Sequence, residues 1–494
     1  MSLLSIAELT QVERSLLVVF CLVGAIGVAS VSRGPGRSVT VAALAHVVGG
    51  LLSLFAGDLI TLLVSWEILA ISAFVVIRAF VIRPHSNGAT VAAVDDMDRT
   101  SRVAFHYLVV QIAAAVLFFV AIVVQYSYQR TVRITALVPA ASGWIIAAVA
   151  IKTAMIPAHG WLITTYGAVP SFSLVLLAAF STKVGALTAA RLVPEGGYTG
   201  LVWLAAAVAA VAPWMAVRQY SMRRLLSYVL IAQVAMVLVG VGLSGGDGPG
   251  AARDLALTAA RFHTVNHILY KTLLFVVAAM VMERVGHDDL RYMGGLWRSM
   301  PLALGAGIVG VGAGIGAPFL NGFTSKELLK HVVESPYIGV LLTVSTVGTA
   351  LALFRFLDGA FFGRASAPTA DRPAGSLWLT VSAPLLALIC VLGGLLPTVV
   401  SGVSEPRVYS AAAIRSAMIL LAAVLLGWIG VRHSLLAAAP GSQWGEKAFT
   451  GLGARLYAAV TWGALGVRRA DPRTLVGLTV VLVVVVVLAL VGVW

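Results

Sequence analysis

Ionisable residues lie inside long apolar stretches of this 494-residue sequence. These residues are Glu67, Lys152, Lys183, His263, His267, Lys271 and Lys326. A charged side chain at the centre of a bilayer costs about 2.5–3.5 kcal/mol on insertion scales, so several of them in one chain require a reason. Because lysine, histidine and glutamate all bind and release protons, we predict that these side chains form a proton pathway.

The most regular pattern is a row of three residues, His263, His267 and Lys271, at intervals of four. On an α-helix this spacing places them on one face, about 6 Å apart along the axis. Imidazole accepts and donates protons near neutral pH, so the row predicts a proton relay. The alternative is a pair of core histidines hydrogen-bonded to neighbouring helices. We assign no ligand role to the scattered histidines His46, His106, His287, His331 and His433.

A carboxylate and a lysine can form a switchable pair. A glutamate next to a buried lysine keeps the lysine charged, and moving or neutralising the glutamate releases the proton. We therefore hypothesise a coupling pair between Glu67 and Lys152, whereas the alternative is a static ion pair that only fixes helix packing. His159, Glu327 and Asp58 are accessory candidates for the same pathway.

Helix breakers occur beside two of the lysines. Lys152 is followed by the run from Pro157 to Gly160, and Lys326 is preceded by the run from Pro318 to Gly322. Proline frees backbone carbonyls, and broken helices within a bilayer are tolerated where protein or water covers them. Ionisable residues beside such breaks are typical of ion sites in transporters. The similar pattern in the two halves predicts inverted repeats.

The composition restricts the class of protein. The chain is 60% hydrophobic and 11% charged, whereas a soluble domain carries about 25% charged residues. Most of the exterior must therefore face lipid. The net charge of +14 comes from arginines at the ends of apolar runs. The positive-inside rule explains this placement better than binding to nucleic acid does. We see no motif for a metal, a cofactor or a catalytic triad, so we expect no enzymatic activity of the chain by itself.

We predict an all-α integral membrane protein with about 14 transmembrane helices. The predicted spans are residues 13–33, 38–56, 58–82, 103–126, 141–166, 171–193, 199–218, 222–243, 254–282, 299–330, 337–361, 376–400, 409–431 and 475–494. The predicted units are N-terminal helices (1–56), a proton-translocating core (57–361), additional spans (362–433), a short amphipathic lateral segment (434–474) and a C-terminal span (475–494).

Alternate loops differ steeply in their content of arginine and lysine. The positive-inside rule then places both termini outside a bacterial or archaeal plasma membrane. The segment from Trp444 to Trp462 has charged and apolar residues at helical spacing, which indicates a helix along the membrane surface or on partner helices. An ordinary loop is the alternative.

Five motifs, in this order, resemble the antiporter-like membrane subunits of respiratory complex I, membrane-bound hydrogenases and Mrp cation/proton antiporters. They are Ser65-Trp66-Glu67, Ile151 to Leu162, Phe262 to Lys271, Met293-Gly294-Gly295-Leu296 and Asn321 to Glu327. The match covers roughly residues 40–360. Two departures stand out: two spans precede the Glu67 span where the family usually has four, and Ala168-Val169-Pro170 replaces the usual Pro-Thr-Pro.

The resemblance implies a role for each ionisable residue. Glu67 and Lys152 would form the coupling pair, and Lys326 would be the outlet. The central relay would consist of Lys183, His263, His267 and Lys271. Members of the family work within multi-subunit membrane complexes, so any redox chemistry would belong to partner subunits.

The run Asn321 to Glu327 looks more like the large subunit of Mrp antiporters. The leading interpretation is therefore a proton-translocating subunit of a cation/proton antiporter, with protons and Na+ or another monovalent cation as its ions. The first alternative is the same subunit type in a complex I-type NADH:quinone oxidoreductase or a membrane-bound hydrogenase. Two others are a non-conducting membrane scaffold and a proton-coupled bicarbonate-uptake subunit.

Overall fold

The computed structural model of the protein describes residues 3–4, 8–32, 36–79, 90–194, 197–245, 250–363, 376–402 and 409–437. The predicted C-terminal span, 475–494, and all but the first residues of the predicted amphipathic segment, 434–474, lie outside this part of the chain. Both remain predictions, as does the division of the chain into five units.

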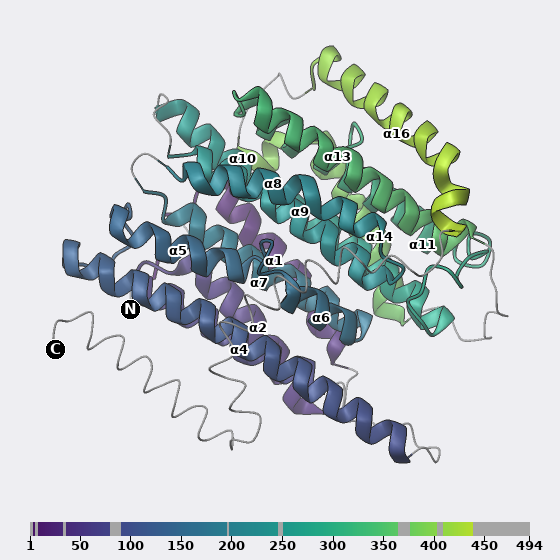
Figure 1. Cartoon of the computed structure of the whole chain (residues 1–494), viewed down its shortest axis with the longest axis horizontal. Helices are drawn as coiled ribbons and strands as arrows, with labels where there is room; N and C mark the ends of the chain where they lie inside the picture. Colours follow the sequence, from purple (N-terminus) through teal and green to yellow (C-terminus); the bar gives the residue numbers. More distant parts are fainter. Residues whose placement is uncertain are drawn as a thin grey trace.

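Helices make up almost all of the described chain (Figure 1). In chain order they are α1 (Gln11–Val31), α2 (Arg37–Phe55), α3 (Leu59–Ala79), α4 (Thr90–Gln129), α5 (Pro139–Lys152), α6 (Gly160–Ala168), α7 (Ser171–Arg191), α8 (Thr199–Val217), α9 (Met222–Leu243), α10 (Gly250–Val285), α11 (Pro301–Ile315), α12 (Asn321–His331), α13 (Pro336–Leu357), the π-helical turn η2 (Asp358–Phe362), α14 (Leu377–Leu395), α15 (Pro397–Ser401) and α16 (Ala411–Ala437).

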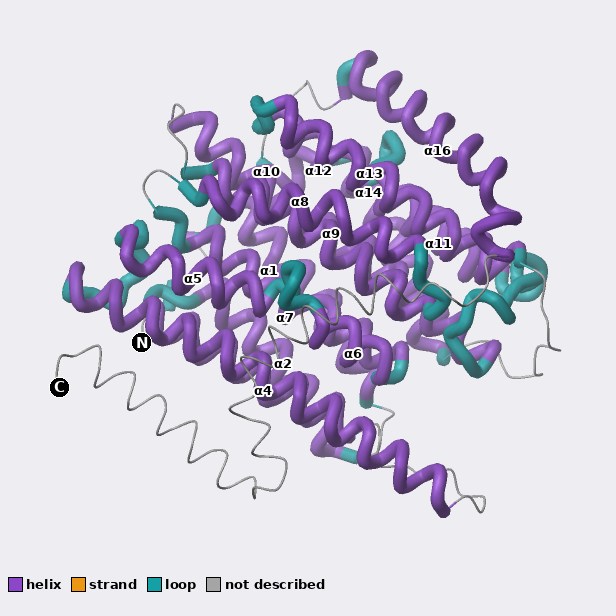
Figure 2. Tube along the Cα trace, viewed as in Figure 1, coloured by secondary structure: helices purple, strands orange, loops and turns teal. Residues whose placement is uncertain are grey.

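Eleven helices of the described chain are long and apolar enough to cross a membrane. Figure 2 shows helices and loops throughout these residues and no strand, as expected where lipid cannot satisfy backbone polar groups. The prediction of an all-α membrane protein is confirmed. The count of about 14 spans is not confirmed, because two predicted spans consist of shorter helices and the last one is outside the described residues.

Both predicted helix breaks are present. The span predicted at 141–166 is interrupted between α5 and α6, where Ala154 has a φ of 56°. The span predicted at 299–330 is interrupted between α11 and α12. Gly316 ends α11 with a φ of 83°, a left-handed conformation that glycine adopts without strain. Lys152 is the last residue of α5, and Lys326 lies within α12, so each lysine is next to a break.

The helices that carry the central ionisable residues lie inside the bundle. We compared an apolar stretch of 18 residues in each helix. All of its residues are buried in α9 and α10 and 94% of them are buried in α7, compared with 22% in α16. In Figure 1, α16 lies at the edge of the bundle, next to α13. A charged or polar side chain costs far less free energy on a helix that other helices shield from lipid. The burial of α7 and α10 therefore explains how these two helices can carry ionisable residues within the membrane.

Candidate functional site

Lys152, the last residue of α5 beside the first helix break, contacts Trp66 of α3. Its side chain is fully buried, and Nζ donates a hydrogen bond of 3.4 Å to the Trp66 carbonyl of α3. The same ammonium lies 4.9 Å from the centroid of the Trp66 ring, a cation–π distance. Trp66 Nε1 in turn donates to Thr188 Oγ1 of α7 at 2.9 Å. The Trp66 side chain thus links the lysine of α5 to α7.

Glu67, the predicted partner of Lys152, is near it but not paired with it. Glu67 is partly exposed, and the described residues contain no ion pair between the two side chains. The two groups are close enough to act on each other electrostatically. The hypothesis of a coupling pair therefore takes a different form here, in which the lysine is bound by a carbonyl and a ring, and the carboxylate acts from a greater distance.

Lys183 of α7 is buried and also binds neutral acceptors. Its Nζ donates to the Ala178 carbonyl at 2.6 Å and to Thr182 Oγ1 at 3.3 Å. Its charge acts on His267 and Lys271 of α10, so the two helices bring these groups within electrostatic range of one another. This arrangement agrees with the direct packing of α7 against α10.

The row of three residues on α10 lies on one face, as the spacing predicts. The rings of His263 and His267 are nearly parallel, with an interplanar angle of 11° and centroids 6.2 Å apart. His263 Nδ1 is 2.9 Å from Ser325 Oγ of α12, and Lys271 Nζ donates to the Leu226 carbonyl of α9. All three side chains of the row are buried.

Several ring nitrogens of this row have no hydrogen-bond partner among the described residues. They are both nitrogens of His267 and Nε2 of His263. Buried polar groups are nearly always hydrogen-bonded, to protein or to ordered water. Imidazoles held between helices without protein partners are therefore the groups that water molecules would bridge. This state differs from the alternative considered above, in which neighbouring helices satisfy both histidines.

Lys326 uses a carbonyl that the second break sets free. Its Nζ donates to the Gly314 carbonyl at 2.6 Å. In an intact helix this carbonyl would accept from the residue four positions later, but that residue is Pro318, which has no N–H. Asn266 Nδ2 of α10 donates to the Asn321 carbonyl at 2.8 Å, which fixes the start of α12 beside the row on α10.

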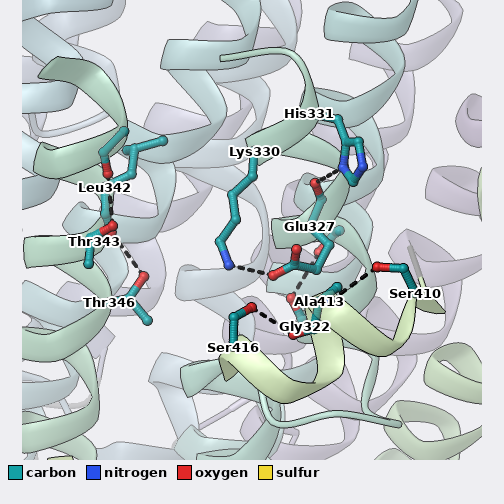
Figure 3. Close-up of polar contacts among 12 residues, drawn as sticks. Gly322, Glu327, Lys330, His331, Leu342, Thr343, Thr346, Ser410, Ala413 and Ser416 are labelled. Atoms are coloured by element: carbon teal, nitrogen blue, oxygen red, sulfur yellow. Dashed lines mark hydrogen bonds and ion pairs between the residues drawn. The ribbon is translucent and has the colours of Figure 1, made fainter. Parts of the chain in front are cut away.

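Glu327 follows Lys326 on α12 and forms an ion pair near the surface of the bundle. Its carboxylate pairs with Lys330, whose side chain is 50% exposed while that of Glu327 is 8% exposed. Figure 3 shows the two groups pointing toward each other, with His331 Nδ1 beside the Glu327 carbonyl at 2.7 Å. The charge of Lys330 acts on Lys326. The short helix α12 therefore carries both a buried lysine and an ion pair that reaches the bundle surface.

The other two accessory candidates have different environments. Asp58 accepts hydrogen bonds from the backbone N–H and the hydroxyl of Thr61, at 2.7 and 3.0 Å, so it caps the start of α3. This cap explains why the carboxylate is buried, and a part of Asp58 in proton transfer stays a prediction. His159 lies in the first break with Nδ1 3.2 Å from the Pro157 carbonyl, and its Nε2 has no partner among the described residues.

One buried histidine has an environment that the sequence pattern did not predict. His46 of α2 is fully buried, its Nδ1 is 2.9 Å from Ser72 Oγ of α3, and its ring meets the edge of Phe180. Its Nε2 has no partner in the described chain, and it lies within electrostatic range of Lys152. Like Lys152, His46 interrupts an apolar run, and this position indicates that the side chain is buried. No second ionisable residue follows or precedes His46 at helical spacing, so the pattern did not single it out.

Two relatives each match about half of this chain. A probable K(+)/H(+) antiporter subunit (A/B) from Rhizobium meliloti is 30% identical over 263 residues, which are 50% of this chain and 25% of that protein. NADH-quinone oxidoreductase subunit N of Desulforudis audaxviator is 32% identical over 286 residues, 54% of this chain and 55% of that protein. The chain thus covers from a quarter to about half of these two relatives.

Solved structures share the fold. The Mrp complex from Dietzia sp. contains a chain with a TM-score of 0.67 and 21% identity, covering 84% of this chain and 86% of that one. The membrane-bound sulfane sulfur reductase, an archaeal respiratory membrane complex, contains one with a TM-score of 0.71 and 18% identity, covering 97% and 89%. At these identities the likeness establishes the arrangement of helices.

The family match covers more than half of the chain and includes both helix breaks and most of the ionisable residues described above. Residues 56–352 match the family described as "NADH:quinone oxidoreductase/Mrp antiporter, TM". The chain is therefore a multi-pass membrane protein that belongs to the NADH:quinone oxidoreductase/Mrp antiporter family.

Proposed function

We propose that the chain is a proton-translocating subunit of a multi-subunit cation/proton antiporter. The observation that carries this proposal is the pair of buried imidazoles on α10, His263 and His267, with ring nitrogens that no described residue satisfies. Lys183 and Lys271 lie within electrostatic range of His267, and Lys326 acts on both histidines. Lys183, the two histidines, Lys271 and Lys326 therefore form one group of buried titratable side chains that interact electrostatically.

The way the lysines are bound supports transfer rather than static pairing. The four buried lysines donate to backbone carbonyls, those of Trp66, Ala178, Leu226 and Gly314. A hydrogen bond from a charged group to a neutral acceptor is worth about 1.5–3 kcal/mol, whereas breaking a buried ion pair costs about 3–5 kcal/mol. A lysine bound by a carbonyl therefore loses and regains its proton more easily than one held by a carboxylate.

The proposed order of transfer follows the helices. Lys152, under the influence of Glu67, would exchange with Lys183 of α7, and the proton would then move to the histidines of α10. Lys326 would be the outlet, with Glu327 beside it. We further propose that protons are exchanged for Na+, K+ or another monovalent cation, and that other membrane subunits complete the complex. In this proposal both termini lie on the outer side of the cell membrane.

A second function has specific support. The match to an NADH-quinone oxidoreductase subunit N at 32% identity favours the same proton pathway driven by redox partner subunits. The two functions differ in the source of energy. In vesicles containing the purified complex, a Na+ or K+ gradient alone should move protons if the complex is an antiporter. Proton movement that requires an electron donor and a quinone would favour the redox-driven alternative. If no protons move under either condition, the result would favour a non-conducting scaffold.

A further inference from the structure

Two hydroxyl side chains follow each other on α12, directly before the buried Lys326. Both Thr324 and Ser325 are fully buried. Thr324 Oγ1 donates to the Asn321 carbonyl of its own helix at 2.8 Å, the usual length of such a bond. Ser325 Oγ lies 3.4 Å from the same carbonyl and 3.5 Å from the Gly322 carbonyl, so both contacts are weak. The two hydroxyls therefore differ in how strongly their own helix binds them.

The Asn321 carbonyl already has two donors, neither of which is Ser325. A carbonyl oxygen accepts through two lone pairs. Thr324 Oγ1 and Asn266 Nδ2 of α10 each donate to this carbonyl at 2.8 Å. The short contact of Ser325 Oγ is instead the one to His263 Nδ1 of α10, at 2.9 Å. Ser325 is therefore a buried hydroxyl whose main partner is a titratable group on another helix.

The row of titratable residues on α10 ends at His263. Towards the start of the helix, its face continues with the buried residues Ala260, Ala259 and Ala256, which bind no protons. The contact of Nδ1 with Ser325 is the one hydrogen bond of this imidazole among the described residues, because Nε2 has no partner there. Among these residues, Ser325 is therefore the group to which a proton can pass from this end of the row.

A hydroxyl suits both protonation states of a histidine. It has one donor and two acceptor lone pairs, whereas a backbone carbonyl only accepts. The charged imidazole donates from Nδ1 to the hydroxyl oxygen, and the neutral imidazole can accept at Nδ1 from the O–H group. Lys326, the next residue after Ser325, lies within electrostatic range of His263. The hydroxyl therefore lies where it can pass a proton between α10 and α12.

We propose that the Ser325 hydroxyl carries protons from His263 on α10 to Lys326 on α12. The Nδ1–H bond of the charged imidazole breaks as a new Oγ–H bond forms, and the original Oγ–H proton moves through a water molecule to the neutral amine of Lys326. Ser325 itself stays uncharged. Reorientation of the hydroxyl and of the imidazole, which then has its proton on Nε2, restores the starting arrangement. This inference rests on the proposed function, because it assigns a residue to one step of the proposed transfer.

The test measures driven proton flux in vesicles that contain the purified complex, under the condition that moves protons in the wild type, either a Na+ gradient or an electron donor with a quinone. Ser325→Ala removes the hydroxyl and should lower the flux by about a hundredfold, the contribution of a side chain that transfers protons. Ser325→Thr keeps a hydroxyl on the same carbon and should retain most of the flux. Thr324→Val is the matched control and should also retain it, because it removes a neighbouring hydroxyl that donates to its own helix.

A second pair of variants separates proton transfer from packing. Threonine and valine have nearly the same shape and differ in the hydroxyl, so Ser325→Val and Ser325→Thr give the same comparison if Ser325→Ala fails to assemble. Wild-type flux from an assembled Ser325→Ala or Ser325→Val complex would overturn the inference. An equal loss of flux in Thr324→Val would also overturn it, because both hydroxyls would then serve the folding of α12.

Replacing the neighbouring lysine tells the two possible failures apart. If an assembled Lys326→Met complex loses driven flux while Ser325→Ala keeps it, the proposed pathway stands and Ser325 is not its connection between α10 and α12. Driven flux that survives both Lys326→Met and Ser325→Ala would count against the proposed function itself.

Discussion

Replacing Lys183 by methionine should separate transport from stability. Methionine keeps most of the length and volume of the lysine side chain, so the buried site on α7 remains filled. The change removes a charge, the hydrogen bond of 2.6 Å to the Ala178 carbonyl and the weaker one of 3.3 Å to Thr182. It leaves no carboxylate unpaired, because no described residue forms an ion pair with Lys183.

The expected magnitudes follow from these contacts. The lost hydrogen bonds are worth about 1.5–3 kcal/mol each, and the charge that no longer has to be buried costs about 2.5–3.5 kcal/mol. The two lost bonds together remove about 3–6 kcal/mol and the relieved burial returns about 2.5–3.5 kcal/mol, so the free energy of unfolding should fall by about 1.5 kcal/mol and by no more than about 3.5 kcal/mol. A side chain that transfers protons contributes about a hundredfold or more to a rate, so proton flux should fall by at least that factor.

The assay combines thermal denaturation of the purified complex in detergent with driven proton flux in vesicles. Leu187→Met, at another buried position of α7, is the control for the side chain introduced and should change neither quantity substantially. The reasoning would be refuted if Lys183→Met kept wild-type flux. It would also be refuted if flux fell together with a loss of stability greater than about 3.5 kcal/mol, because the lysine would then serve helix packing.

Two further outcomes test the helix break and a loop outside the membrane. Gly322→Ala would place a Cβ in direct collision with the Ala313 carbonyl oxygen, so the assembled yield on size-exclusion chromatography should collapse, whereas Gly305→Ala, which has open space, should assemble normally. Burial of Asp288 opposes its ionisation, but its 2.9 Å bond from Arg223 prevails and lowers the pKa of Asp288 below 3.8. The pair should therefore stabilise the fold fully above about pH 4 and lose this contribution as pH falls through the lowered pKa, by about 1 kcal/mol or less because both side chains are partly exposed. Asp288→Asn should abolish that pH dependence of the denaturation temperature, and an unchanged dependence would contradict the assignment.

Much of the fold follows from local chemistry. Apolar runs of membrane-spanning length predicted the helices, and proline and glycine beside Lys152 and Lys326 predicted the two breaks, because these residues act on the backbone within a few positions. The number of spans was less accessible. A broken helix counts as one span in a hydropathy pattern, yet it forms two short helices in space.

The site was predictable where its geometry depends on one helix. The spacing of four placed His263 and His267 on one face of α10, and the rings do lie side by side. Contacts between helices were not predictable in this way. The sequence contains nothing to show that Lys152 contacts Trp66 rather than the neighbouring Glu67, or that His46 packs against Phe180. Such contacts depend on how helices rotate and pack, which local pattern leaves open.

The central claim is that the buried ionisable residues carry protons. The most direct measurement compares proton flux in vesicles containing the wild-type complex with flux for Lys152→Ala, with Arg218→Ala as a control that removes an exposed positive charge. Our account predicts that Lys152→Ala abolishes driven flux while the complex stays assembled, and that Arg218→Ala retains it. Wild-type flux from an assembled Lys152→Ala complex would contradict the account and leave the buried charges with a role in helix packing alone.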